Sequence, residues 1–400
     1  MVVPKGRGAP ATPSPVLPAE DGAGRGTALV LAGGGARAAY HVGVLSAIAE
    51  RMPDASFPIL TGVSAGAINV TYFAGQECGF REAVERMRQE WLAVHPGRVF
   101  RARPGGWIAA ALRLSWQAAW GGLASRARVR GLLDLDPLRE FVEGWFDAEA
   151  IDRNIAAGRL RALAVSATGF SSGRSVTFVH GASDAALWRG AHGVALRTRL
   201  SPDHLMASTA IPVLFPPVRI GGEFYGDGGV KHTSPLGPAI RLGARSVLAV
   251  GMRANQGSTD EPYGPGDYPT FAETIGLLLD SIFIDGLEVE AEQLYRMNRT
   301  LMTLPPDVPP PRGLHPVNLI MLRPSRDLAA LAVGHSRLLP RRLQRTIRTL
   351  GGADEAAAGL LSYLLFVRPF TSTLIELAYE DTGACWPAIE RFFAGVGAER

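Results

Sequence analysis

Cysteine is nearly absent from this 400-residue chain, which contains only Cys78 and Cys385. Two thiols form one disulfide at most, and neither stands in a group with the spacing of metal ligands. These absences argue against a disulfide-stapled secreted domain and against a cysteine-based metal site. We therefore expect a protein of a reducing, cytoplasmic compartment that uses no metal and no other cofactor.

Strong charge and long apolar runs are also lacking. The formal net charge of +4 is too small to indicate a nucleic-acid partner. No apolar run reaches the roughly 18 residues of a membrane-spanning helix, since the closest, residues 356–370, is interrupted by Arg368 and Pro369. Residues 1–26 are rich in Pro, Ala and Gly but lack the apolar stretch of a secretory signal, which predicts a disordered tail.

What the chain does contain is an alternation of apolar runs, glycine turns and helical periodicity. The runs at 27–32 and 57–61 are typical of buried parallel strands, and a helical segment follows each of them. This order predicts a parallel sheet with right-handed crossovers. We expect further strands at residues 159–170, 174–179, 244–252 and 316–322.

The composition changes at residues 254–270, which are rich in Gly and Pro. Such a break separates elements that fold around different parts of a core. We expect a core over residues 27–252 and, over residues 253–400, a linker and a mostly helical extension that returns one strand, at about 316–322, to the sheet.

Three consecutive glycines, Gly33 to Gly35, follow the first apolar run. A dinucleotide site would need a third glycine where the chain has Ala38, and an acidic residue where the second strand ends in Thr61 and Gly62. A Walker phosphate loop would need a lysine after the glycines, and none follows. Both kinds of phosphate site are therefore disfavoured.

A G-x-S-x-G pattern spans Gly62 to Gly66, between the second apolar run and a helical segment. A nucleophile elbow requires this strand–turn–helix setting, which presents Ser64 at the C-terminal edge of the sheet and at a helix N-terminus that favours negative charge. A five-residue pattern of this kind also occurs by chance in a Gly- and Ala-rich chain. It is the position between a strand and a helix, rather than the pattern itself, that favours a nucleophilic serine.

The residues alone leave the base for this serine open. A triad requires a histidine oriented by an acid, and none of the eight histidines has an obvious setting of that kind. His232 and His315 lie beside turn residues, and we expect both to be structural. Asp227 lies between Gly226 and Gly228, but an aspartate flanked by glycines is usually a turn residue.

Taken together, the glycine loop, the serine turn and the aspartate resemble the patatin-like phospholipase family. That family has a G-G-G-x-[RK] loop, a G-x-S-x-G elbow and a distant D-G-[GA], which correspond here to residues 33–37, 62–66 and 227–229. Similar segments occur at 130–142, 162–178 and 208–218. The resemblance covers about residues 27–252.

The resemblance implies a three-layer α/β/α fold with a central, mostly parallel sheet, and a serine hydrolase that acts on lipid esters. Ser64 would be the nucleophile, and Asp227 would take its proton directly, without a histidine. Because a carboxylate is a weak base, we predict that burial raises the pKa of Asp227. The implied oxyanion hole comprises Gly33, Gly34, Gly35, Ala36 and Arg37, and the implied supporting glycines are Gly62, Gly66, Gly228 and Gly229.

Two departures from the family pattern bear on loop geometry and substrate range. Ala38 stands where the family often has glycine, and Thr233 and Ser234 stand where it often has asparagine before the proline. Neither change touches the two residues of the implied dyad.

A lipid hydrolase must also reach its substrate in an aggregate. Residues 106–123 carry Trp107, Trp116 and Trp120, and predict either an interfacial helix or cap, or a helix packed on the core. Residues 359–377 offer the same alternatives, and for both segments we expect core packing. A peripheral contact with a membrane stays open. The alternatives to a lipid acyl hydrolase are a broad carboxylesterase or thioesterase of the same fold, and a catalytically silent lipid-binding protein.

Overall fold

The computed structural model describes residues 26–395 except for 103–130, 132, 191–192, 213, 232–235, 256–269, 306–307, 312–313, 342 and 346–356. The tail expected at residues 1–26, apart from Gly26, lies outside the described residues. So do the tryptophans of the 106–123 segment, His232, Thr233 and Ser234, and most of the Gly/Pro-rich break.

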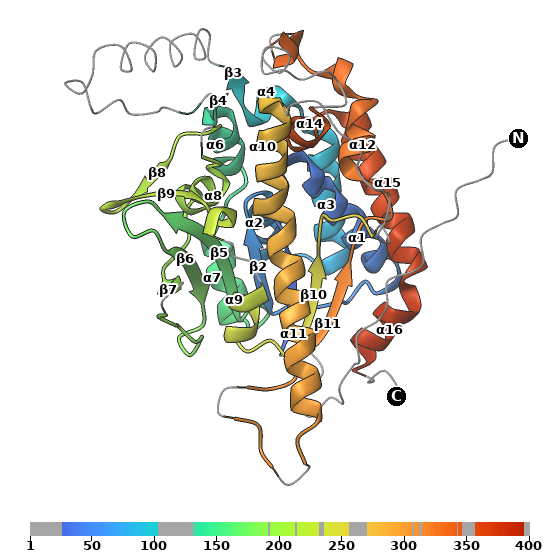
Figure 1. The fold of residues 1–400 in the computed structure, drawn as a ribbon. Helices are drawn as coiled ribbons and strands as arrows, with labels where there is room; N and C mark the ends of the chain where they lie inside the picture. Colours follow the sequence, from blue (N-terminus) through green and yellow to red (C-terminus); the bar gives the residue numbers. More distant parts are fainter. Residues whose placement is uncertain are drawn as a thin grey trace, which may run out of the picture.

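One sheet of nine strands organises the described part of the chain (Figure 1). Its main path runs β11-β10-β1-β2-β5-β6-β7, with β9 paired to β5 and β8 paired to β9. Neighbouring strands from β11 to β5 are parallel, whereas β6 and β9 run antiparallel to β5. The strands are β1 (Thr27–Leu31), β2 (Ile59–Val63), β5 (Ala162–Gly169), β6 (Ser175–Gly181), β7 (Gly193–Arg197), β8 (Val218–Ile220), β9 (Glu223–Asp227), β10 (Ser246–Val250) and β11 (Asn318–Leu322).

Successive residues of the central strands face two separate cores, because side chains alternate across a strand. In β1, Leu29 and Leu31 pack into one core, and Ala28 and Val30 into the other. Helices α1 (Ala39–Arg51) and α15 (Arg368–Ala384) contribute to the first core, and α11 (Gly286–Met302) to the second. The expected three-layer α/β/α fold with a mostly parallel sheet is therefore confirmed.

The remaining helices surround this frame (Figure 1). Near the C-terminal ends of β1 and β2 lie α2, the 3-10 helix η1 and α14, and the π-helical turn η3 joins α10 to α11. Two short strands, β3 (Arg101–Ala102) and β4 (Leu133–Asp134), form a separate ribbon. The helices and turns are η1 (Gly35–Ala38), α2 (Ala65–Ala74), α3 (Phe80–Ala93), α4 (Pro96–Val99), α6 (Asp136–Glu143), α7 (Ala148–Ala156), α8 (Pro202–Thr209), η2 (Gly228–Lys231), α9 (Leu236–Arg241), α10 (Phe271–Asp280), η3 (Ser281–Asp285), α12 (Leu328–Val333), η4 (Ser336–Leu338), α14 (Ala358–Leu364) and α16 (Trp386–Ala394).

The antiparallel half of the sheet differs from the expectation at Asp227. Taken alone, the glycines around this residue are typical of a turn, but Asp227 is the last residue of β9 and pairs with Ala167 of β5. The strands β8 and β9 span 3 and 5 residues and form a hairpin. Segments this short carry too little alternation to be recognised as strands.

The C-terminal third joins the sheet and the first core. Strand β11 pairs in parallel with β10, and Leu360, Phe370 and Leu374 are buried in the core beside α1. Among the described residues, no single helix has the length and apolarity to cross a membrane, and the pair α14 and α15, which meets that test jointly, is bent by 95°.

Candidate active site

Ser64 lies at a sharp turn between β2 and α2, where the backbone is strained. Its φ of 54° makes it the one described residue other than glycine in the positive-φ region, a conformation that persists only when the surroundings enforce it. A Cβ on Gly66 would lie 2.2 Å from the carbonyl oxygen of Leu31, and one on Gly62 would lie 2.6 Å from that of Gly66. The two glycines therefore permit the close approach of α2 to β1 that makes this turn.

A side chain from another element holds the Ser64 backbone in place. The Ser64 N–H donates to Ser208 Oγ at 2.9 Å, and the Ser208 hydroxyl donates to the carbonyl oxygen of Ser166 on β5 at 2.7 Å. Ser208 is fully buried on α8. Ser208 begins the family-like segment 208–218, but nothing in the spacing of that segment indicates this contact.

Asp227 is fixed by its own backbone and by the glycines that follow it. Its N–H donates to the carbonyl oxygen of Ala210 at 2.9 Å, and its carbonyl oxygen accepts from Thr168 Oγ1 at 2.9 Å. Its Oδ1 accepts from the N–H of Gly229 at 2.9 Å. A Cβ on Gly228 would lie 2.4 Å from the carbonyl oxygen of Ser166, so this residue has to be glycine for the loop to pack.

The Asp227 carboxyl group is fully buried, and burial raises its pKa to about 7, in the direction predicted from the sequence. The Gly229 N–H and the Ser64 hydroxyl each lower that pKa against the larger effect of burial. Ser64 is therefore a neighbour of this carboxyl group. Asp227 Oδ2 has no hydrogen-bond partner among the described residues.

The glycine loop runs beside Ser64. A Cβ on Gly33 would lie 3.2 Å from Ser64 Cβ, and one on Gly35, whose φ is +55°, would lie 2.3 Å from the carbonyl oxygen of Tyr363. Ala38 is buried with φ −65° and ψ −7°, an ordinary right-handed conformation. Alanine in place of glycine at this position therefore costs the loop no backbone strain.

Arg37 anchors this loop to the C-terminal part of the chain. Its guanidinium donates to Asp280 Oδ1 at 2.9 Å and to Ser362 Oγ at 2.7 Å, and it lies 4.1 Å from the centre of the Tyr363 ring. Tyr363 Oη also donates to Asp280 Oδ1, at 2.8 Å. Arg37 is 2% exposed. Sequence reasoning missed all three partners, because each lies more than 240 residues away.

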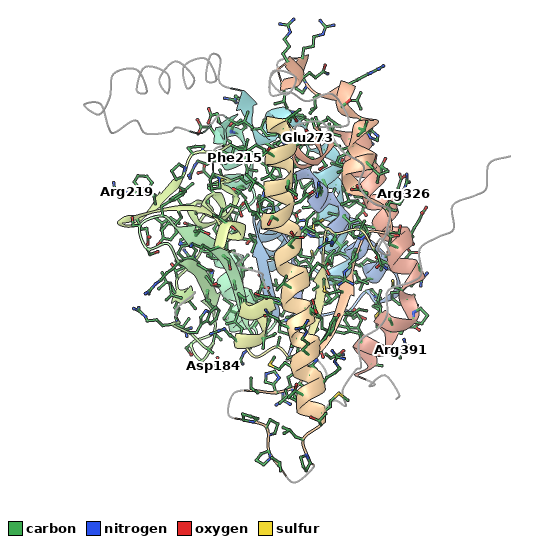
Figure 2. All side chains as sticks on the ribbon, in the orientation of Figure 1. Asp184, Phe215, Arg219, Glu273, Arg326 and Arg391 are labelled. Carbon is green, nitrogen blue, oxygen red and sulfur yellow. The ribbon has the colours of Figure 1, made fainter. Side chains whose placement is uncertain are left out.

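An apolar cavity opens beside Ser64 and Gly35. Phe215, labelled in Figure 2, lines it from the loop between α8 and β8. Asn69, Glu90 and Thr209 are among its few polar contributors. The apolar and aromatic lining comprises Ala65, Ile68, Tyr72, Met87, Trp91, Val94, Val99, Leu135, Leu138, Phe141, Trp145, Ile211, Phe215, Tyr363, Leu364 and Phe366.

None of the histidines among the described residues lines this cavity. Burial lowers the pKa of His41 to about 3, and its ring contacts Asn69. His180 Nε2 pairs with Asp152 Oδ1 at 2.6 Å. His180 pairs with Leu163 of β5, which in turn pairs with Leu60 near the start of β2. Ser64 follows the other end of that strand. Among the residues that the structure describes, Ser64 therefore has a carboxyl neighbour and no imidazole neighbour.

Metal ligands are not clustered in the described part of the chain. No group of three or more His, Cys, Asp or Glu side chains there has the geometry to hold an ion. The arrangement around Ser64 instead combines a hydroxyl, a buried carboxyl group and glycine N–H donors. This set of groups suits nucleophilic attack on a carbonyl carbon.

Comparison with known proteins identifies a family. A family model described as patatin-like phospholipase matches residues 29–240, which is more than half of the chain. No curated protein sequence matches significantly.

Solved structures with a similar fold include VipD from Legionella pneumophila, at 13% identity over 94% of this chain and 72% of that chain, with a TM-score of 0.30. They also include human GIVD cytosolic phospholipase A2 in complex with methyl gamma-linolenyl fluorophosphonate, at 14% identity over 92% of this chain and 59% of that chain, with a TM-score of 0.36. A third is ExoU in complex with SpcU, from the type III secretion system of Pseudomonas aeruginosa, at 15% identity over 93% and 74% and a TM-score of 0.28. Scores this low support no correspondence of individual residues.

Proposed function

This chain belongs to the patatin-like phospholipase family, and from that premise we propose that it is a lipid acyl hydrolase that cleaves carboxylic esters through a Ser64 acyl-enzyme. The observation that carries the proposal is the strained Ser64 turn beside a buried Asp227 whose pKa is raised to about 7. A serine is a weak nucleophile until a neighbouring base takes its proton. A carboxylate with that pKa is better matched to this task at neutral pH than an ordinary aspartate.

Acylation proceeds in two proton transfers. Ser64 Oγ bonds to the ester carbonyl carbon while its proton passes to the Asp227 carboxylate. The tetrahedral intermediate then collapses, the bond between that carbon and the alcohol oxygen breaks, and Asp227 returns the proton to the departing oxygen. Water repeats the sequence on the acyl-enzyme, with Asp227 again as the base, and releases a carboxylic acid.

The negative oxygen of each intermediate is stabilised by backbone N–H groups of the Gly33–Gly35 loop. Glycines leave these N–H groups open to an approaching oxygen, since no Cβ shields them. A donor of this kind is worth about 3 kcal/mol in the transition state. Arg37 acts on the loop through its contacts with Asp280 and Ser362. The N-terminus of α2, which begins just after Ser64, adds a favourable dipole.

The apolar cavity supports a lipid as the substrate. Its lining of aliphatic and aromatic side chains begins at Ser64, so an acyl chain in the cavity brings its ester carbonyl to the nucleophile. We place the reaction at a lipid aggregate in the cytoplasm, with a peripheral contact between protein and membrane.

A fluorophosphonate probe tests the nucleophile directly. The wild type should be labelled and Ser64→Ala should not, while Ser46→Ala, a helix serine away from the cavity, should label like the wild type. Asp227→Asn should slow hydrolysis of a lipid ester by roughly 10²–10⁴-fold. Full hydrolysis by Asp227→Asn, together with loss of activity in His180→Gln, would overturn the dyad in favour of a triad.

A further inference from the structure

Two apolar features lie near Ser64. The first is the apolar cavity, which Ser64, Gly35 and Tyr363 help to line. The second is the ring of Phe283, which lies beside Gly33, is 4% exposed and is not part of the cavity wall. Phe283 comes from the π-helical turn η3, in the long column that α10 and α11 form in Figure 1. Single π-helical turns occur often at functional sites.

The Phe283 ring touches both loops of the candidate site. A Cβ on Gly33 would lie 2.4 Å from Phe283 Cδ1, and a Cβ on Gly229 would lie 3.2 Å from the same atom. The ring centre is also 5.6 Å from that of Tyr363. The aromatic ring therefore occupies the space between the glycine loop and the loop that follows Asp227.

The chemistry of ester cleavage places the alcohol part of the substrate in that space. Asp227 must return its proton to the departing alcohol oxygen, so that oxygen has to lie next to the carboxyl group. The acyl part lies in the cavity that Ser64 helps to line. The alcohol part consequently extends past Gly229, where Ile282 and the Phe283 ring lie.

We propose that Phe283 is a specificity-determining residue that limits the size of the alcohol part, so that the enzyme prefers acyl esters of small alcohols to esters of bulky glycerophosphoryl groups. This inference rests on the proposed function. It extends the proposed function by naming the substrate class. The cavity accommodates the acyl chain, and the Phe283 ring limits the size of the alcohol part.

The test is a series of decanoyl esters with alcohols of increasing size, presented in the same nonionic detergent micelles. Methyl decanoate, monodecanoyl glycerol and decanoyl lysophosphatidylcholine share one acyl chain and differ only in the alcohol. For the wild type, kcat/KM should fall by at least about tenfold from the first ester to the last, which is a usual degree of discrimination by pocket size.

Phe283→Ala should reduce the ratio of kcat/KM for methyl decanoate to kcat/KM for decanoyl lysophosphatidylcholine, mainly by raising the value for the phosphocholine ester. Phe283→Leu is the second variant, because leucine retains more of the buried volume than alanine. It tests the proposal even if the Phe283→Ala protein does not fold. Phe366→Leu is the matched control on the cavity side. It should change the dependence on acyl length and leave the dependence on the alcohol as in the wild type.

Two outcomes overturn the proposal and leave the hydrolase assignment intact. One is a wild type that cleaves all three esters equally well. The other is a folded Phe283→Leu or Phe283→Ala protein with the wild-type ratio. A wild type that cleaves none of the esters, and resists the fluorophosphonate probe, contradicts the proposed function itself and this inference with it.

Discussion

Close to Ser64 and Asp227, residues 29–240 contribute mainly glycines packed against backbone atoms, whereas residues beyond 270 contribute mainly large side chains. Gly66 meets the carbonyl oxygen of Leu31, and Gly228 meets that of Ser166. From the C-terminal part come Asp280 against Arg37 and Phe283 against Gly33. The two regions supply the two faces of one site.

The difference teaches why only one of these regions shows a recognisable pattern. A position where the Cα packs directly against backbone atoms accepts only glycine, so the structure determines the residue type there. A contact made by a large side chain can be made by several residue types at several positions. A region can therefore contribute much of a site while its sequence shows no pattern for it.

The largest expected effect comes from adding a methyl group to a glycine of the first region. In Gly66→Ala the new Cβ would lie 2.2 Å from the Leu31 carbonyl oxygen and 2.4 Å from that of Ala32. These atoms belong to the buried backbone at the end of β1, which cannot yield, so we expect a loss of more than about 4 kcal/mol in the free energy of unfolding, or no folded protein. Urea unfolding measures it.

The control for this glycine is Gly79→Ala. Gly79 has φ −62°, and a Cβ there would have no neighbour within 4 Å. The substitution at this helix N-cap should cost less than about 1 kcal/mol. Equal losses of unfolding free energy in Gly66→Ala and Gly79→Ala would show that packing of backbone atoms against Gly66 does not determine the effect.

Asp227→Asn is expected to stabilise the protein while it inactivates the enzyme. Burial raises the carboxyl pKa from 3.8 to about 7, so the folded state holds this proton where the unfolded state has lost it. The stability that this group contributes is fully present below pH 4 and is lost as the pH rises through 7, by at most roughly 4 kcal/mol. Asparagine cannot ionise, so the variant should gain stability over the wild type at pH 8 and little at pH 4. The same difference at both pH values would contradict the raised pKa.

In the C-terminal region, Asp280→Ala removes the acceptor that Arg37 and Tyr363 share. Because the Asp280 side chain is 37% exposed, we expect a loss of about 2 kcal/mol, below that for a fully buried pair. The loosened glycine loop should lower kcat and leave KM nearly unchanged, and Asp280→Asn, which keeps an acceptor, should recover part of kcat. Asp285→Ala is the control, since its pair with Arg253 is exposed. An unchanged kcat in Asp280→Ala would show that the extension does not position the loop.

The smallest expected effect is that of Ser208→Ala in the first region. It leaves the Ser64 N–H and the Ser166 carbonyl oxygen without the partner they share, at a cost of about 1–1.5 kcal/mol. We expect kcat to fall while KM is kept, because only the nucleophile's backbone loses support. Ser372→Ala, whose hydroxyl contacts an exposed helix carbonyl group, should change neither value. A wild-type kcat in Ser208→Ala would show that the Ser64 turn is held by its glycines without help from Ser208.

The sequence predicted those features whose causes are local. The first two strands, each followed by a glycine turn and a helix, appear in patterns of a few residues, and so do the turn at Ser64 and the glycine loop. The parallel strand at β11 follows from its apolar run and lies within the expected 316–322 segment. The raised pKa of Asp227 followed from the implied role of its carboxyl group, and burial is its cause.

The features that sequence reasoning missed depend on contacts between distant segments. Ser208 is one serine among many until α8 is placed against β5. Asp280, Phe283 and Tyr363 lie in apolar or mixed helices with no turn residue or spacing to mark them. The short strands β8 and β9 carry no periodicity, so the place of Asp227 at a strand end could not be read.

The position of β10 and β11 has a consequence for dividing this protein into fragments. The family match ends at residue 240, but β10 begins at Ser246 and pairs along all of β1. A chain cut at that boundary would leave β1, an apolar strand in the middle of the sheet, with an open row of unpaired N–H and C=O groups. Such an edge is a template for another copy of the same strand. A fragment that contains every recognisable motif would therefore be expected to aggregate.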